Sequence, residues 1–409
     1  MSATQPTALR GATPSLLRLK RGEERRLAAG HLWVFSNEVD TAATPLTAFS
    51  PGGHAELRSA RDAFMGHAYV NPHALICARI LSRRAERPID ATLIEERLAA
   101  ALELRRRLGA PDFCRWVFGE SDLLPGLVLD RYGSVVVGQS ATAGMEALLP
   151  VVAEAVQCLV NPTTLLWKND TAARELEGLP RETQLAFGPL PESLTVREGT
   201  LTFEVPLGAA QKTGWFYDQA ANRAHLARYL PAGSRVLDVC CYAGAWGVSA
   251  LRHGAASALC VDAAQAALEC ASANAARNGL GIDTLRADAF EALQQLGARG
   301  ERFDVVVLDP PAFIKRRKDA PQGQAAYRKL NQLALAVLKE GGLLVSCSCS
   351  YHLAPEELLA AIQGAARQAG RFVQVLETGG QSPDHPLHPA IPETRYLKAF
   401  FCRVTGAVG

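Results

Sequence analysis

Two short stretches of the sequence bring together residue types that can do covalent chemistry. An aspartate followed by two prolines stands in 309-DPPAF-313, and Cys347 and Cys349 stand in 346-SCSCSYH-352. Each stretch follows an apolar run that is typical of a buried strand. A thiolate is a strong nucleophile, and a nearby carboxyl group can hold or exchange a proton. The two stretches therefore predict a site for nucleophilic catalysis, provided that the fold brings the two strand ends together.

Strand-like and helix-like segments alternate from about residue 198 onward. This alternation predicts a Rossmann-like, doubly wound α/β domain with a mostly parallel sheet, whose last strand can run antiparallel. Ligands gather at the carboxyl ends of such strands, and we expect Asp309 and Cys349 to lie on neighbouring strands. We predict strands over 235–240, 257–262, 282–288, 303–309, 343–349, 372–377 and 396–404, and helices over 263–279 and 324–341.

A cysteine and an acid on adjacent strand ends suit the methylation of a cytosine ring. Carbon 5 of cytosine attacks a methyl group poorly until a thiolate adds at carbon 6. We expect Cys349 to add to carbon 6, while Asp309 holds the N3/N4 edge of the base and favours protonation there. By strand alternation Cys347 faces the same way, but it lies two residues deeper and is expected to be inert. A small hydrophobic residue that only fills the core is the alternative for Cys349.

Acids also end the three earlier strands, at Asp238, Asp262 and Asp288. The first of them lies in 236-VLDVCCYAGAWG-247, which lacks the G-x-G-x-x-G pattern of a dinucleotide site. S-adenosylmethionine fits this set better, with its amino group on Asp238, its ribose hydroxyls on Asp262 and its adenine amino group near Asp288. A turn that merely connects strand and helix, and a chance set of solvated acids, are the alternatives.

The segment 208-GAAQKTGWFYDQAANR-223 is rich in polar and aromatic residues. Lys212 is placed to face a phosphate or the cofactor carboxylate, and Asp218 and Asn222 share one helical face. A capped, solvated helix is the alternative interpretation of this segment. The remaining residues that we expect to bind the cofactor are Gln211, Thr213, Tyr242, Gly244, Ala289 and Asp309.

The stretch after Asp309 is expected to bind the substrate. The two prolines enforce a rigid, extended exit from the strand, and an aromatic ring beside them can stack on a nucleobase. The basic runs 315-KRRK-318 and 18-RLKRGEERR-26 can hold an RNA backbone, although a solvated surface is the plainer interpretation of each. The residues expected to bind substrate are Pro310, Phe313, Lys315, Arg316 and Arg317.

The length of 409 residues predicts more than one domain. Short alternating runs predict a β-rich module over 15–84, a second α/β unit follows over 85–197, and the Rossmann-like domain occupies 198–409. The ten cysteines include no C-x-x-C pair, so no metal site is expected. The first residues lack the apolar core of a secretion signal, and no stretch is long enough to span a membrane, which favours a reducing cytoplasm.

Several stretches together closely resemble the RlmI-like bacterial methyltransferases that make 5-methylcytosine in large-subunit ribosomal RNA. The resemblance spans nearly the whole chain, and the motifs are specific in combination. They are 30-GHLWVFSNEV-39, 119-GESDLLPGLVLDRYG-133, 208-GAAQKTGWFYDQAANR-223, 236-VLDVCCYAG-244, 309-DPPAF-313 and 346-SCSCSYH-352.

The resemblance implies an N-terminal PUA RNA-binding domain, a central α/β domain and a catalytic domain that binds S-adenosylmethionine, often in a homodimer. It implies 23S rRNA, or an assembling large subunit, as the partner. The family nucleophile aligns with Cys349. Related RNA cytosine methyltransferases carry a second cysteine where this chain has Pro311, so a one-cysteine scheme is implied and the base that removes the carbon 5 proton is unassigned.

The sequence departs from the family pattern at several positions near the predicted site. Ala220 stands where an arginine is usual, and Trp215 where Phe or Leu is more common. Cys241 and Trp246 also differ from the usual aromatic and glycine choices. These differences concern contacts to cofactor and RNA, and the choice of nucleotide, rather than the type of chemistry.

Two other functions are also consistent with the sequence. An exocyclic-amine rRNA methyltransferase would also use an acid followed by two prolines and an aromatic residue, but it would need no cysteine. A non-catalytic RNA-binding assembly factor would keep the RNA contacts without binding S-adenosylmethionine. A nicotinamide-dependent dehydrogenase is less consistent with the sequence, because the glycine fingerprint is missing.

Overall fold

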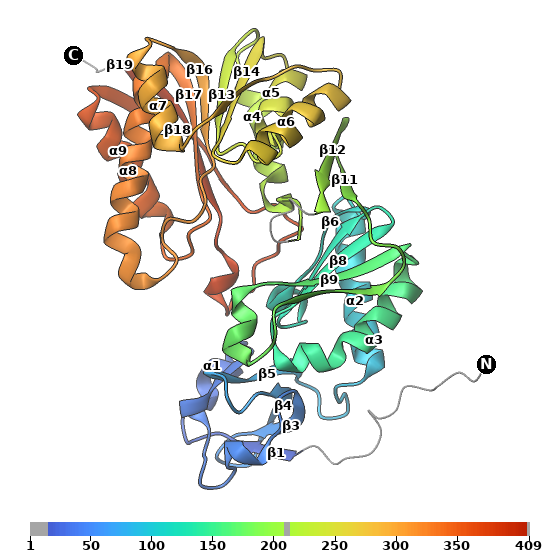
Figure 1. Ribbon diagram of the computed structural model, residues 1–409. Coiled ribbons are helices and arrows are strands. Elements are labelled where there is room, and N and C mark those ends of the chain that lie inside the picture. The colour runs from blue at the N-terminus through green and yellow to red at the C-terminus, as the bar shows by residue number, and fades with distance from the viewer. Residues whose placement is uncertain (1–14, 208–212, 407–409) are drawn as a thin grey trace. The chain divides into compact units, whose positions relative to one another are not determined.

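The structure, a computed structural model, describes residues 15–207 and 213–406 (Figure 1). The chain separates into two compact units. Unit 1 comprises Met1–Leu190 and Asp384–Thr394, and unit 2 comprises Pro191–Pro383 and Arg395–Gly409. All the predicted catalytic residues and strand-end acids therefore belong to unit 2.

The first part of unit 1 is a five-stranded sheet with the order β1-β3-β4-β5-β2. It matches the β-rich character that the short alternating runs predict, and its core is built from apolar side chains such as Leu17, Leu57 and Ile80. The predicted boundary after residue 84 stays a prediction. The elements are β1 (Ser15–Arg18), α1 (Glu24–Ala28), β2 (Trp33–Phe35), β3 (Gly53–Arg58), β4 (Phe64–Val70) and β5 (Ile76–Ser82).

A second five-stranded sheet, with the order β10-β9-β8-β7-β6, packs with two long helices. The first helix begins at Ala91, because the Asp90 side chain accepts a hydrogen bond from the Leu93 amide and caps the helix. The elements are α2 (Ala91–Arg107), β6 (Phe113–Phe118), β7 (Leu127–Tyr132), β8 (Val135–Ser140), α3 (Ala143–Val160), β9 (Thr164–Asn169) and β10 (Glu182–Phe187). Among the described helices, α3 alone is long and apolar enough to cross a membrane, but a buried core helix has the same composition and Met145, Leu148 and Val152 lie in the core.

The late segment Asp384–Thr394 belongs to unit 1 because it is bonded there. Arg105 is fully buried, pairs with Asp122 and donates to the Asp384 carbonyl oxygen at 2.6 Å. The Arg115 amide donates to the Asp384 carboxylate at 2.9 Å, and Ile391 packs in the core of the first sheet. The chain thus contributes to unit 1 twice, which the linear division of the sequence did not include.

Unit 2 opens with the antiparallel hairpin of β11 (Ser193–Glu198) and β12 (Leu201–Pro206). The Glu204 amide donates to the side chain of Asn274 in helix α6 (Gln265–Arg277). The Thr202 amide donates to the side chain of Asn278, directly after that helix. Because β11 pairs with β12 along its whole length, the hairpin belongs to one unit, and unit 2 begins before it, at Pro191. The predicted boundary after residue 197 lies within β11.

The centre of unit 2 is a seven-stranded sheet with the order β15-β14-β13-β16-β17-β19-β18. The five strands from β15 to β17 are parallel, and β19 runs antiparallel to both of its neighbours. This confirms the Rossmann-like α/β fold. The strands are β13 (Arg235–Val239), β14 (Ser257–Asp262), β15 (Asp283–Arg286), β16 (Phe303–Leu308), β17 (Leu338–Ser348), β18 (Arg371–Gly380) and β19 (Lys398–Gly406).

Helices cover both faces of this sheet (Figure 1). On one face Leu237, Val306 and Leu344 pack against α7, α8 and α9. On the other face Val236, Val305 and Val345 pack against α4 and α5. This alternation decides which side each strand-end residue faces. The helices are α4 (Ala220–Tyr229), α5 (Ala245–Arg252), α6 (Gln265–Arg277), α7 (Ala289–Ala298), α8 (Ala320–Val337) and α9 (Pro355–Gln368).

Candidate active site

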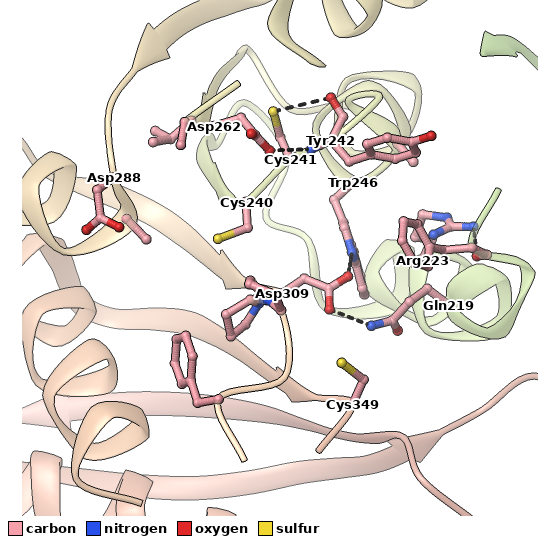
Figure 2. Close-up of a pocket in the computed structure, with 18 of the residues that line it drawn as sticks. Gln219, Arg223, Cys240, Cys241, Tyr242, Trp246, Asp262, Asp288, Asp309 and Cys349 are labelled. Atoms are coloured by element: carbon pink, nitrogen blue, oxygen red, sulfur yellow. Dashed lines mark hydrogen bonds between the residues drawn. The ribbon is translucent and has the colours of Figure 1, made fainter. Parts of the chain in front are cut away.

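A cavity lies at the carboxyl ends of the parallel strands of unit 2, where a doubly wound sheet is expected to hold its ligand. It is lined by residues that follow β13, β14, β15, β16 and β17, together with residues 215–223 and Leu397. Asp309 and Cys349 both line it, so the structure brings the two predicted catalytic residues together. Figure 2 shows the thiol of Cys349 directed toward the side of the cavity that carries Asp309 and Gln219.

The strand register explains how Asp309 and Cys349 reach the same cavity. Asp238 of β13 pairs with Val307 of β16, which in turn pairs with Val345 of β17. Asp309 lies two residues beyond Val307, and Cys349 lies four residues beyond Val345. Asp238, Asp309 and Cys349 therefore all project from the face of the sheet that α4 and α5 cover. Asp309 lies two residues further along the strand direction than Asp238, and Cys349 lies four residues further.

The alternation of serine and cysteine in 346-SCSCS-350 has a structural cause. Cys347 packs on the α4 and α5 face and is fully buried, and its burial raises the pKa of the thiol well above the ordinary value. The serines face α8, where the Tyr327 hydroxyl accepts from Ser348 at 2.8 Å and bonds Ser350 at 2.9 Å. Cys349 is the first residue after β17 and is partly exposed to the cavity. The serines thus fix the segment that presents Cys349.

The serine network also fixes the stretch that carries Asp309. The Ile314 amide, which directly follows 309-DPPAF-313, donates to the Ser350 hydroxyl at 3.2 Å and ties that stretch to 346-SCSCSYH-352. Phe313 lines the cavity, and its ring lies 4.7 Å from that of Tyr327 and 6.0 Å from that of Phe290. Pro310 lines the cavity as well.

Asp309 sits in a polar setting within the cavity wall. Its carboxylate accepts from the Gln219 amide at 2.8 Å and from the Trp246 indole at 3.1 Å (Figure 2). The pKa of Asp309 is raised to about 6, chiefly by burial and also by the charge of Asp218, while the hydrogen bonds from Trp246 and Gln219 and the charge of Arg223 partly offset the rise. A carboxyl group with this pKa can exchange a proton near neutral pH.

The turn after β13 forms the opposite wall of the cavity and has an unusual backbone. Cys240 and Tyr242 have positive φ angles of 65° and 48°, which residues other than glycine rarely adopt. The Tyr242 amide donates to Asp262 at 3.0 Å (Figure 2), and Ala264 donates to the other oxygen of Asp262 at the same distance. Backbone strain of this kind concentrates at ligand sites.

Not all the predicted cofactor residues lie in the cavity. Tyr242, Asp262, Asp288 and Ala289 line it, and the Asp288 carboxylate also caps α7 by accepting from the Phe290 amide. Asp238, Gly244 and Thr213 do not line it. Gly244 instead has a φ of 76° and lies so close to α6 that a Cβ would come within 2.8 Å of Ala271. Gln211 and Lys212 lie outside the described residues.

Asp238 supports the turn rather than the cavity. It is fully buried, and its Oδ2 accepts from the Gly247 amide at 3.0 Å. Burial raises the pKa of this carboxyl to about 7. Asp238 therefore lies outside the cavity lining, because it stands two residues lower in the register than Asp309 and is covered by α5. Its contact with the cofactor amino group stays a prediction.

The basic run at 315–318 is fully exposed and lies outside the cavity lining. Arg316 pairs with Asp319 at 3.0 Å, while Lys315, Arg317 and Lys318 make no salt bridge among the described residues. The run is therefore a surface feature that follows the cavity wall in sequence.

Sequence reasoning missed several residues of the cavity. Gln219 and Trp246 hold Asp309, and Arg223 lines the wall while it bonds Glu198. Gln219 and Arg223 stand in the segment 208–223, where Lys212, Asp218 and Asn222 were predicted to be functional but these two residues were not. Nothing in the linear pattern joins them to Asp309, because they come from elements that meet only in the fold.

The cavity suits a ligand with a flat ring, a sugar diol and a cationic end. Phe290 and Phe313 supply aromatic surface, and Asp262 and Asp288 supply acceptors. Asp218 lines the cavity as well, and its Oδ1 has no donor among the described residues, while Oδ2 accepts from Tyr396. Among the residues that the structure describes, no group of three or more His, Cys, Asp or Glu side chains could hold a metal ion.

Comparisons with known proteins identify the family. Residues 17–83 match the PUA-like domain family, and residues 170–401, more than half of the chain, match the S-adenosylmethionine-dependent methyltransferase family. Ribosomal RNA large subunit methyltransferase I of Photobacterium profundum is 34% identical to this chain over 94% of the chain and 98% of its own length. The protein of the same name from Cronobacter sakazakii is 33% identical over the same shares.

The chain belongs to the ribosomal RNA large subunit methyltransferase I family. It is an S-adenosylmethionine-dependent methyltransferase, which confirms the predicted cofactor and the RlmI-like resemblance. The fold is also that of a solved putative methyltransferase in complex with SAH, with a TM-score of 0.80, 20% identity, and coverage of 96% of this chain and 100% of that one.

Proposed function

We propose that this methyltransferase adds a methyl group to carbon 5 of a cytosine in large-subunit ribosomal RNA. The names of its relatives and the PUA-like match support an rRNA substrate. The observation that carries the C5 chemistry is the position of Cys349, which follows β17 and lines the same cavity as Asp309. Methylation of an exocyclic amine would not require a thiol at that place.

In this scheme Cys349 acts as the nucleophile. Its thiolate adds to carbon 6 of the cytosine, which makes carbon 5 electron-rich. Asp309 has a pKa of about 6, so its carboxylate can accept from the N4 amino group and its protonated form can donate to N3 as negative charge develops there. Carbon 5 would then form a bond to the methyl group that bound S-adenosylmethionine supplies, with S-adenosylhomocysteine as the leaving group. Loss of the carbon 5 proton to a base that is not assigned restores the ring double bond, breaks the bond between carbon 6 and sulfur and regenerates Cys349. Phe313 offers a ring on which the base can stack.

The wall formed by the turn after β13 would hold the cofactor. Asp262 would accept from the ribose hydroxyls, the capping Asp288 and Ala289 lie where the adenine edge is expected, and Tyr242 borders the sugar. Asp218 offers an acceptor for the cationic end. Bound S-adenosylmethionine supplies an electrophilic methyl group.

The RNA backbone would be held by exposed basic residues. In the first basic run Arg18 and Arg26 pair with Asp62 and Glu38, so they are engaged within the protein. Lys20, Arg21 and Arg25 are exposed, as is the run at 315–318. We expect RNA affinity to fall steeply with salt, and an affinity that hardly changes from low to moderate salt would remove these residues from the interface. A cytoplasmic location, an assembling large subunit as substrate and a homodimer stay predictions.

The deciding experiment compares the wild type with Cys349→Ala on 23S rRNA and labelled S-adenosylmethionine, with nucleoside mass spectrometry of the product. We expect 5-methylcytidine with the wild type and none with Cys349→Ala. The matched control is Cys347→Ala, which removes a buried thiol two residues away and should keep the product. Calorimetric binding of S-adenosylmethionine to each variant separates loss of chemistry from loss of the cofactor site.

The alternatives give different outcomes in the same experiment. A Cys349→Ala protein that methylates as well as the wild type, with a product methylated on an exocyclic nitrogen, would replace the C5 scheme by amine methylation. The arrangement of Asp309, Pro310 and Phe313 in the cavity is the observation that favours that second function. Absence of cofactor binding by the wild type would point to an assembly factor.

A further inference from the structure

Lys398 is a buried cation that no carboxylate neutralises. It begins β19, and only 4% of the residue is exposed. Its Nζ donates to the backbone carbonyl oxygens of Ser350 and, at 2.8 Å, Tyr396. Among the described residues it takes part in no salt bridge. Carbonyl oxygens offer only partial charges, and burying a full charge without a counter-ion costs free energy.

The position of Lys398 relates it to Cys349. In the antiparallel pairing of β17 and β19, Lys398 stands opposite Ser348, the residue before Cys349. The carbonyl oxygen of Ser350, the residue after Cys349, accepts from Lys398. The lysine therefore holds the backbone on both sides of the cysteine, by strand pairing before it and by its side chain after it.

Lys398 approaches Cys349 from behind the cavity. Every second residue of a strand faces the same side of the sheet, so Lys398 faces the same side as Phe400 and Cys402. Phe400 and Cys402 pack in the core between the sheet and helices α8 and α9. Lys398 does not line the cavity, whereas its neighbour Leu397 does. It cannot touch base or cofactor from there, so any role in the reaction is exerted through the Cys349 segment.

The charges around the two residues favour a pair between them. Burial lowers the pKa of Lys398 to about 8, and a negative charge on Cys349 is the largest influence that raises it; Arg395 lowers the pKa and Glu357 of α9 raises it. Cys349 in turn faces Tyr327 of α8, Cys347 of β17 and, across the cavity, Asp309. The Arg223 guanidinium also lines the cavity, but it is paired with Glu198. Lys398 has no carboxylate partner in a salt bridge among the described residues, so its charge is available to the thiolate.

We propose that Lys398 is a positioning residue that supplies the counter-charge for the thiolate of Cys349. When the thiol ionises, its proton leaves to solvent and Lys398 keeps its own proton, so the buried ammonium gains the anion that the resting protein lacks. The inference rests on the proposed function, in which Cys349 is the nucleophile. A nearby cation favours the thiolate form, and the bond to the Ser350 carbonyl fixes its direction.

The test measures the ionisation of Cys349 in the full chain without RNA. The rate of alkylation by iodoacetamide is followed against pH by mass spectrometry of the peptide that contains Cys349, in the wild type and in Lys398→Met. Methionine keeps the length of the side chain and removes the charge. We expect the midpoint to rise by about one pH unit and the rate at pH 7 to fall about tenfold, since one pKa unit is a factor of ten.

Two comparisons separate charge from structure. Arg395→Met removes an exposed positive charge from the same segment, and we expect it to leave the Cys349 midpoint unchanged because solvent screens that charge. A purely structural role for Lys398 would change the rate by one factor at every pH without moving the midpoint, and that result would overturn the proposal.

A reciprocal measurement does not depend on the folding of Lys398→Met. Coupled groups affect each other equally, so neutral Cys349→Ser should lower the pKa of Lys398, read from the NMR shift of labelled lysine and assigned with Lys398→Arg. An unchanged lysine pKa would overturn the proposal. Because both measurements omit RNA, a failure of C5 methylation would show only in the nucleoside product and is distinguishable from a failure of this pairing.

Discussion

The carboxyl ends of β13 and β16 lie next to each other and each carries an aspartate, yet the two acids have different environments. Asp238 is the fourth residue of β13 and is sealed under α5 by its bond to Gly247. Asp309 comes after β16 ends, two residues higher in the register, and lines the cavity. A step of two residues along one face of the sheet thus separates an acid that supports a turn from one that can reach a ligand.

Asp309→Asn should have the largest effect on activity within this comparison. Asparagine keeps the size of the side chain and can still accept from Gln219 or Trp246, but it cannot exchange a proton with the base. We expect turnover to fall by about 10²–10⁴-fold, the range for loss of a general acid or base. Single-turnover methylation of rRNA measures it, with cofactor binding as the control. A turnover within twofold of the wild type would make Asp309 equivalent to Asp238.

Asp262→Asn should have a smaller effect, mainly on the cofactor. Asp262 accepts hydrogen bonds from the Tyr242 amide in the turn after β13 and from the Ala264 amide after β14. It is also proposed to bind the ribose. Loss of its charge should raise the dissociation constant for S-adenosylmethionine by about ten- to a hundredfold, as for hydrogen bonds to a charged group. Calorimetry measures this, and turnover at saturating cofactor should stay close to that of the wild type. A lower turnover with unchanged affinity would contradict the ribose assignment.

Asp238→Asn should have the smallest effect on activity and a distinct effect on stability. Because burial raises the pKa of Asp238 to about 7, the folded protein holds a proton there that the unfolded chain releases from about pH 4 upward. The wild type should therefore lose free energy of unfolding as pH rises from about 4 to 7. Asparagine removes this slope, and the difference should reach about 1–4 kcal/mol at pH 7.

Urea unfolding of Asp238→Asn at several pH values checks this prediction. The matched control is Asp309→Asn, whose difference from the wild type in free energy of unfolding should stop growing at about pH 6, the pKa of the carboxyl that it removes. If the free energy of unfolding had the same pH dependence in the wild type and in Asp238→Asn, the Asp238 carboxyl would have the same protonation in the folded and unfolded states. That result would contradict the prediction. A large loss of cofactor affinity would instead return Asp238 to the binding site.

The sequence predicted more of the fold than of the individual side-chain roles. The strands predicted over 235–240, 257–262, 303–309 and 343–349 were placed correctly because their runs are mostly apolar and flanked by turns. The boundaries were less accurate: β17 begins at Leu338 within the predicted helix 324–341, and it ends before Cys349. Residues 384–394 return to unit 1 through contacts that no local pattern encodes.

Among the candidate site residues, the outcome depended on the contacts that each prediction required. Asp309 and Cys349 were brought together because adjacent parallel strands end at one edge. Asp238 was expected at the same edge, but it stands two residues lower in the register than Asp309 and is covered by α5. Gln219 and Trp246 were not assigned, since a residue that holds Asp309 from another helix has no signature in the spacing of Asp309 itself.

What the sequence determined by itself is the methyltransferase family, its cofactor and the order of the elements. The acid, the two prolines and the cysteine at strand ends are readable because side-chain chemistry and strand periodicity are local properties. Only the tertiary structure decided which acid faces the cavity, why serines alternate with cysteines before Ser350, and that the buried Lys398 lies behind Cys349. These depend on strand register and on the packing of α4, α5 and α8, which bring together residues far apart in the chain.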